Sequence, residues 1–273
     1  MALNGARIGL LESRMSGELA TLIRNSGGEP RSAPSVKEVP LSRQGEVAVF
    51  IDRLAAGSYK FVLFMTGVGV KALFQEAEGL GRLDELLEAL RKTTTVCRGP
   101  KPIAVLKRHD IPISIAAPEP NTTAEVIQAL KGLPLANQRV AMLHYGERAD
   151  EMAEFLSGQG ALLDELWLYE WQLPEDTGPM KELISEIIRG ELDSVAFTSK
   201  VQVRHLFQVA GQIGKADELR EALNSKTVVT AIGPTCAASL TEAGVTPLIV
   251  PEHPKMGYMV KAMDDYFAAR RLH

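Results

Sequence analysis

The apolar residues of the chain alternate between two spacings. Short runs rich in β-branched residues, such as residues 60–66 and 227–233, are each followed by an apolar pattern of helical period, at 69–80 and 235–244. The same order recurs at 6–13 with 17–28, 94–99 with 101–110, 113–119 with 122–133, 139–146 with 149–160, 194–199 with 201–213, and 247–252 with 255–267. Strands that alternate with helices form parallel sheets, so the pattern predicts an α/β fold.

The two halves of the chain resemble each other. Residues 64–77 (FMTGVGVKALFQEA) align without a gap with residues 197–210 (FTSKVQVRHLFQVA), and residues 98–111 align with 232–245 through a shared Gly-Pro pair. Any two strand–helix units share apolar periods, but these identities also fall on turn and polar positions. We therefore predict a duplicated half and two similar domains with a cleft between them.

Two irregular stretches, residues 29–42 and 161–179, interrupt the alternation. Each follows the first strand–helix unit of its half and has enough proline or strand-like content to be an extended connection. We interpret them as interdomain linkers. The first domain would then comprise residues 1–36 and 172–273, and the second residues 37–171.

Composition excludes several classes of protein. The chain has 273 residues, 45% hydrophobic and 23% charged, and a net charge of −4 without a basic stripe, which argues against a nucleic-acid partner. Cys97 and Cys236 form no metal-binding motif, and His109 and His205 are interpreted as surface or capping residues. No apolar run is long enough for a membrane span and no signal peptide is evident, so we expect a cytoplasmic protein that binds a small molecule.

The turns after the strands are the candidate binding elements. At the carboxyl edge of a parallel sheet, helix N-termini present unpaired N–H groups and a partial positive charge, which favour bound carboxylates or phosphates. Motifs for dinucleotides and for a P-loop are absent from the sequence, which argues against a nucleotide ligand. The candidate residues are Ser13, Arg14, Thr66, Gly67, Val68, Gly69, Arg98, Gly99, Lys101, Asn121, Thr122, Thr123, Tyr145, Gly146, Thr198, Ser199, Lys200, Gly233, Pro234 and Thr235. Their Ser and Thr hydroxyls have an equally good interpretation as plain helix caps.

Several of these stretches together resemble the uroporphyrinogen-III synthase family. The resemblance rests on residues 196–203 (AFTSKVQV), 231–244 (AIGPTCAASLTEAG), 250–263 and the tyrosine in 167–174 (WLYEWQLP), and on the length and the duplicated halves. It implies two flavodoxin-like or Rossmann-like parallel-sheet domains, joined by a two-stranded antiparallel linker, with the active site in the cleft.

The resemblance also implies an activity. Members of the family cyclise the anionic linear tetrapyrrole hydroxymethylbilane, with inversion of ring D and loss of water, and use no metal or organic cofactor. The enzyme steers a substrate that closes unaided to the wrong isomer, so positioning matters more than a strong nucleophile. We expect a monomer that contacts no membrane and that meets porphobilinogen deaminase transiently.

Tyr169 matches the family tyrosine and is the candidate general acid for the departing hydroxyl. The alternation in WLYEW also permits a purely structural residue that packs with Trp167 and Trp171, and Tyr145 is a weaker candidate for the acid.

The chain departs from the family pattern where Cys236 and Pro102 stand at turns that often carry Thr. An inactive relative that binds a tetrapyrrole or another polyanion therefore remains open, as does an unrelated two-lobed binding protein.

Overall fold

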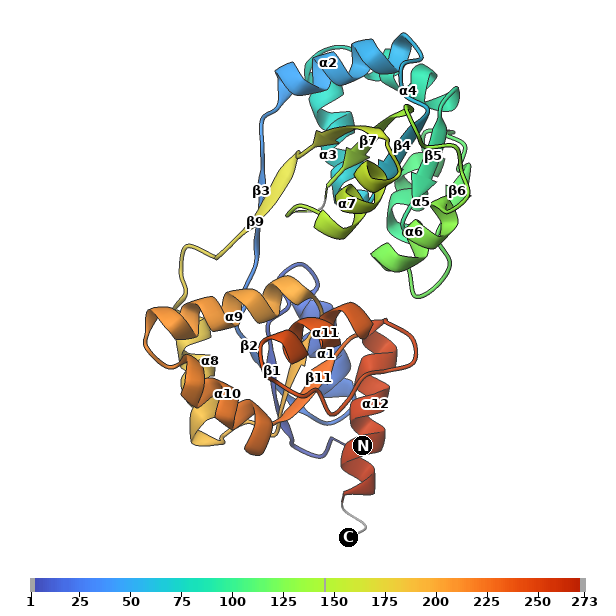
Figure 1. Ribbon diagram of the computed structural model, residues 1–273. Coiled ribbons are helices and arrows are strands. Elements are labelled where there is room, and N and C mark those ends of the chain that lie inside the picture. Colours follow the sequence, from blue (N-terminus) through green and yellow to red (C-terminus); the bar gives the residue numbers. More distant parts are fainter. Residues whose placement is uncertain (1–2, 145, 271–273) are drawn as a thin grey trace. The chain divides into compact units, whose positions relative to one another are not determined.

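The computed structural model describes residues 3–144 and 146–270 (Figure 1). The chain divides into two compact units, each with its own sheet: unit 1 comprises Met1–Lys37 and Gln172–His273, and unit 2 comprises Glu38–Trp171. Unit 2 is thus inserted into the sequence of unit 1.

Unit 1 contains a four-stranded sheet in the order β11-β10-β1-β2, and the three strand pairs are parallel. Its elements are β1 (Arg7–Leu10), α1 (Ser16–Asn25), β2 (Glu29–Ser32), α8 (Gly178–Arg189), β10 (Ser194–Phe197), α9 (Lys200–Gln212), α10 (Ala216–Ser225), β11 (Val228–Ala231), α11 (Pro234–Glu242) and α12 (Met256–Ala269).

Both faces of this sheet are covered by helices. Side chains alternate along β1 and β10, so Ile8 and Leu10 pack with α1 and α12, while Val195 and Phe197 pack with α8, α9, α10 and α11. Strands buried on both faces read as continuous apolar runs, which is why the sequence located them.

Unit 2 contains a five-stranded sheet in the order β6-β5-β4-β7-β8, again with parallel pairs. Its elements are α2 (Gln44–Ala55), β4 (Phe61–Phe64), α3 (Gly67–Gly79), α4 (Leu83–Arg91), β5 (Thr94–Cys97), α5 (Pro100–Lys107), β6 (Ile115–Ala116), α6 (Thr123–Leu130), β7 (Arg139–Leu143), α7 (Asp150–Gly158) and β8 (Leu162–Leu166). Helices α2, α3, α4 and α5 cover one face of the sheet, and α6 and α7 cover the other. The predicted α/β fold with two parallel sheets is confirmed.

The two stretches interpreted as linkers hold more structure than expected. Only β3 (Lys37–Pro40) and β9 (Tyr169–Gln172) form the predicted two-stranded antiparallel connection. The first part of each stretch instead adds an edge strand to a central sheet, since β2 pairs with β1 and β8 pairs with β7. An edge strand is partly exposed and can contain proline, as β2 does at Pro30, so its sequence lacks the continuous apolar run of a buried strand.

Candidate functional site

The carboxyl edge of the unit 2 sheet gathers the ends of several strands. Helices α3, α5 and α6 begin after β4, β5 and β6, so their N-terminal amides lie along one edge. Thr66 caps α3 by accepting a 3.0 Å hydrogen bond from the Gly69 amide. Thr122 caps α6 in a capping box with Glu125. The interpretation of both threonines as helix caps is therefore correct, and the neighbouring amides are the better candidates for binding an anion.

Close backbone packing joins these turns to one another. A Cβ atom on Gly67 would lie 2.8 Å from the Lys101 carbonyl oxygen, and one on Gly99 would lie 3.0 Å from the Asn121 side chain. A side chain at residue 67 would therefore force the backbone to shift, and one at residue 99 would require the Asn121 side chain to move. The structure thus brings together the predicted residues of three turns, at 66–69, 98–101 and 121–123.

Tyr169, the candidate acid, lies at the start of β9 and belongs to the same edge. Its side chain is buried, with 3% exposure, and its hydroxyl oxygen is 3.0 Å from Thr66 Oγ1. The rings of Tyr169 and Trp171 meet edge to face, with their centroids 6.3 Å apart. The packing with Trp171 is therefore present together with a polar contact of the hydroxyl.

Gly146 packs directly against the Trp171 ring. It has a φ of 41°, a conformation that favours glycine, and a Cβ atom there would lie 2.2 Å from the indole ring. The Trp171 amide also donates a 3.2 Å hydrogen bond to the Gly146 carbonyl oxygen. The alternative acid Tyr145 lies outside the described residues.

His144, at the end of β7, was not singled out in the sequence. It is buried, it stacks on Trp167 with ring centroids 4.2 Å apart, and its Nδ1 accepts a 3.1 Å hydrogen bond from the Ala149 amide. Burial lowers the pKa of His144 and outweighs the opposing influence of Glu165, whose carboxylate lies 3.3 Å from Nε2. The ring is therefore neutral, with its proton on Nε2. A polar residue directly after the buried run 139–143 was the signal that could have located it.

The corresponding edge of unit 1 is partly filled by Glu12. One carboxylate oxygen accepts hydrogen bonds from the amides of Arg14 and Met15, at 3.1 and 3.2 Å. The other accepts a short hydrogen bond from the Thr198 hydroxyl and a 3.2 Å bond from Gln202 Nε2. The turn predicted to bind a carboxylate through Ser13 and Arg14 thus already holds one of the protein's own.

The remaining predicted residues of unit 1 lie at the starts of α9 and α11. Ser199 occupies the cap position of α9 without a side-chain cap bond. Gly233 precedes α11, where a Cβ atom would lie 2.8 Å from Pro254. Pro234 and Thr235 are exposed, and Lys200 is half-buried. These turns follow adjacent strands, β10 and β11, and so share one edge of the sheet with the turn after β1.

Cys236 and His205, two residues discussed from the sequence, are both buried in unit 1. Cys236 donates from Sγ to the Phe197 carbonyl oxygen at 3.6 Å, and burial raises the pKa of its thiol to about 12. It is therefore a packed thiol rather than a nucleophile. The placement of His205 at the surface was wrong: it is buried, and its Nδ1 lies 2.6 Å from the Ser35 carbonyl oxygen.

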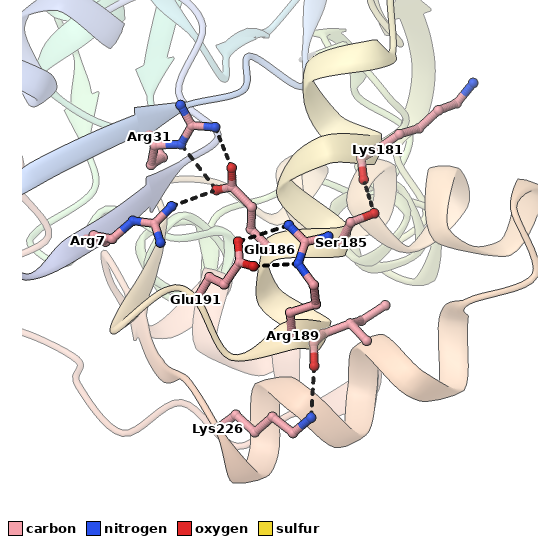
Figure 2. A network of polar contacts seen from close by, with 9 residues as sticks. Arg7, Arg31, Lys181, Ser185, Glu186, Arg189, Glu191 and Lys226 are labelled. Carbon is pink, nitrogen blue, oxygen red and sulfur yellow. Dashed lines mark hydrogen bonds and ion pairs between the residues drawn. The ribbon is translucent and has the colours of Figure 1, made fainter.

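Two open depressions are lined by residues outside the predicted set. One, of about 440 Å³, is lined by residues of α6, including Glu125 and Gln128. The other, of about 470 Å³, lies along α8, where Glu186 pairs with Arg31 and Arg7 (Figure 2). Figure 2 shows that these charged groups bond to one another across α8, β1 and β2, as a structural network does. Residues 3–144 and 146–270 contain no cluster of three metal-type ligands and no helix long and apolar enough to span a membrane.

Comparison with known proteins assigns the family. Residues 17–261 match the family model described as uroporphyrinogen-III synthase HemD. The chain belongs to the uroporphyrinogen-III synthase family. It is 31% identical over 263 residues to the uncharacterized protein YjjA of Bacillus subtilis, an alignment that covers 96% of each chain. It is 32% identical over 253 residues to the "Putative uroporphyrinogen-III synthase" of Methanothermobacter thermautotrophicus, with 91% of this chain and 93% of that relative covered.

Solved structures agree with the assignment to the uroporphyrinogen-III synthase family. A mutant uroporphyrinogen III synthase from Thermus thermophilus superposes with a TM-score of 0.76 at 25% sequence identity, covering 98% of this chain and 100% of that chain. The resemblance stated from the sequence is thereby confirmed at the level of family and fold.

Proposed function

We propose that this chain is an active uroporphyrinogen-III synthase that closes hydroxymethylbilane to uroporphyrinogen III with inversion of ring D. The observation that carries the proposal is the family match, which spans residues 17–261. A buried tyrosine hydroxyl at the carboxyl edge of unit 2, 3.0 Å from the cap of α3, supports it.

Substrate binding rests on the carboxyl edges of the two sheets. Acetate and propionate groups of the tetrapyrrole bind backbone amides at helix N-termini, which lets a protein of net charge −4 hold a polyanion. In unit 2 the turns at 66–69, 98–101 and 121–123, with Gly146, provide these amides. In unit 1 the turns at 233–235 and at Ser199 and Lys200 do so. The amides of Arg14 and Thr198 contribute less, because Glu12 and Gln202 already accept from them.

Tyr169 is the proposed general acid. It donates its phenolic proton to the hydroxyl group on the terminal methylene carbon of the substrate, the C–O bond breaks with its electron pair on oxygen, and water leaves. The substituted carbon of ring D then attacks the methylene carbon and forms a spiro intermediate. The bond from that ring carbon to the methylene group shared with ring C breaks, ring D inverts, and its unsubstituted α-carbon attacks the freed methylene carbon, which closes the macrocycle; that α-carbon then loses its proton. The proton released at the end returns to Tyr169. Since the hydroxyl departs readily unaided, the bound conformation of the substrate decides the product.

The experiment is an isomer assay. Purified protein coupled to porphobilinogen deaminase should give the type III porphyrin after oxidation, whereas the deaminase alone gives type I. Tyr169→Phe should lower kcat by about 100-fold or less, at the low end of the range for positioned proton donors. Tyr169→Ala should also lower the III-to-I ratio, because it removes the ring that packs with Trp171.

A protein that binds the tetrapyrrole without closing it is the second candidate. It is favoured by Cys236, which places a buried thiol where the family often has a hydroxyl, and by Glu12, which fills one anion-binding turn. Quenching of tryptophan fluorescence by the tetrapyrrole, together with type I product alone, would identify such a binder.

A further inference from the structure

We propose that Thr66 is a positioning residue for Tyr169. Its hydroxyl fixes the place of the tyrosine hydroxyl and donates a hydrogen bond to the phenolic oxygen as the proton leaves. This inference rests on the proposed function, in which Tyr169 is the acid, and assigns to Thr66 a second task besides capping α3.

The position of Thr66 is set by the helix. Thr66 has an extended backbone, with φ −145° and ψ 152°, and the Gly69 amide donates to its Oγ1 at 3.0 Å. A hydroxyl group has one proton and two lone pairs. The Gly69 amide uses one lone pair, so the proton and the other lone pair remain for further bonds, one of which is the 3.0 Å contact with Tyr169.

The direction of that contact follows from the charge that develops. While Tyr169 keeps its proton, either hydroxyl can be the donor. Once the proton moves to the departing hydroxyl, the phenolic oxygen is negative and can only accept. Thr66 then donates to it by a rotation about its Cβ–Oγ1 bond, with no movement of heavy atoms. Hydrogen bonds to a charged partner are about twice as strong as neutral ones, so the bond favours the proton-transfer state over the ground state.

Gly69 makes room for this pair, and the duplicated half shows what replaces it. A Cβ atom on Gly69 would lie 3.2 Å from Thr66 Oγ1 and 3.8 Å from the Tyr169 ring. The aligned position in unit 1 is Gln202, whose side chain bonds to Thr198 instead. The two edges have therefore diverged. In unit 2 the cap residue Thr66 contacts the Tyr169 hydroxyl, and in unit 1 Gln202, at the position of Gly69, bonds to Thr198.

The test is a double-mutant cycle on kcat for type III product. Thr66→Val removes the donor, and we expect kcat to fall about 10-fold with KM little changed, because the bond strengthens only as the proton leaves. The effect cannot exceed that of Tyr169→Phe. Thr66→Ser should retain kcat. In the Tyr169→Phe background, Thr66→Val should lower kcat no further.

Two variants separate this role from helix capping. Thr66→Asp keeps an acceptor for the Gly69 amide, since Asp caps helices well, but it supplies no donor, so kcat should fall although the urea midpoint is retained. Thr93→Val makes the same chemical change in unit 2, at a hydroxyl bonded to the Ala89 carbonyl oxygen at the opposite end of β5, and should leave kcat unchanged.

If the parent protein is active, any of three results would overturn the role of Thr66 and leave the proposed function standing. The reductions in kcat caused by Thr66→Val and Tyr169→Phe could multiply in the double variant. Thr66→Ser could be as slow as Thr66→Val, or Thr66→Asp could keep full activity. A parent protein that forms only the type I isomer would overturn the proposed function and this inference with it.

Discussion

Gly146→Ala tests the packing that supports Tyr169. The new methyl group would start 2.2–2.6 Å from three atoms of the Trp171 ring, so the indole must move and its edge-to-face contact with Tyr169 is lost. A non-glycine residue at positive φ costs about 1–2 kcal/mol. The aromatic pair contributes about 0.5–1.5 kcal/mol. The free energy of unfolding should therefore fall by about 1.5–3.5 kcal/mol, the sum of the two ranges.

Urea denaturation provides the measurement, with Gly132→Ala as the matched control. Gly132 has a φ of 85° and no atom within 4 Å of its would-be Cβ, so this variant carries the backbone strain without the collision. A second readout is tryptophan emission in a Trp167→Phe background, where Trp171 is the remaining tryptophan. Gly146→Ala should shift that emission to longer wavelength as the indole becomes exposed.

The reasoning fails if Gly146→Ala destabilises no more than Gly132→Ala and leaves the emission of Trp171 in place. A further check is Gly146→Ala combined with Trp171→Leu. Because the smaller side chain removes the collision, adding Gly146→Ala to the Trp171→Leu variant should cost less than adding it to the parent protein.

Three other predictions concern charged and titratable groups. Glu186→Ala should lower the free energy of unfolding by about 1.5–3 kcal/mol in urea melts, because Glu186 is buried and bonds to Arg31 through two nitrogens; the fuller cost of breaking a buried pair does not apply, since the Arg31 side chain is 49% exposed. Burial lowers the pKa of folded His144 below the unfolded value of about 6.5, so the stability that its neutral ring provides is present above that pH and lost as pH falls; His144→Gln should flatten the fall in urea midpoint between pH 7 and pH 5. Glu12→Ala should cost about 1–3 kcal/mol in the same assay by removing the acceptor of one N–H of the buried Gln202 amide, whereas an unchanged midpoint would contradict the network.

The sequence predicted most of the buried strands and several helices not at all. The strand expected at 247–252 was wrong, because only Ile249 pairs there, in an isolated bridge with Thr230. Buried parallel strands such as β4 and β10 are continuous apolar runs that end at Thr or Gly turns, so both their position and the edge they end on could be inferred. Helices α2, α4, α8 and α10 were not singled out. Each is an additional helix in a connection that already contains a helix or was interpreted as extended, and the alternation of one strand with one helix gives no reason to expect it.

The candidate site was predictable as a set of turns and not as a set of contacts. Thr66, Gly99 and Asn121 could be placed on one edge because parallel strands end together. The bond from Gln202 to Glu12 joins residues 190 positions apart, and no local pattern reveals it. For the same reason, the sequence could suggest that Tyr169 packs with Trp171 but could not indicate Thr66 as its polar partner.

The insertion of unit 2 into the sequence of unit 1 has a consequence for the order of folding during synthesis. When residue 171 has been added, unit 2 is complete and can fold, whereas unit 1 then has only β1, α1 and β2. The Arg7 amide, for example, donates a hydrogen bond to the Asp193 carboxylate, which is made 186 residues later. Domains generally fold as units, N-terminal first, but here residues made before unit 2 belong to the unit that is completed after it. The apolar strand β1 therefore stays exposed until β10 is made, and the nascent chain is most prone to aggregation over that interval.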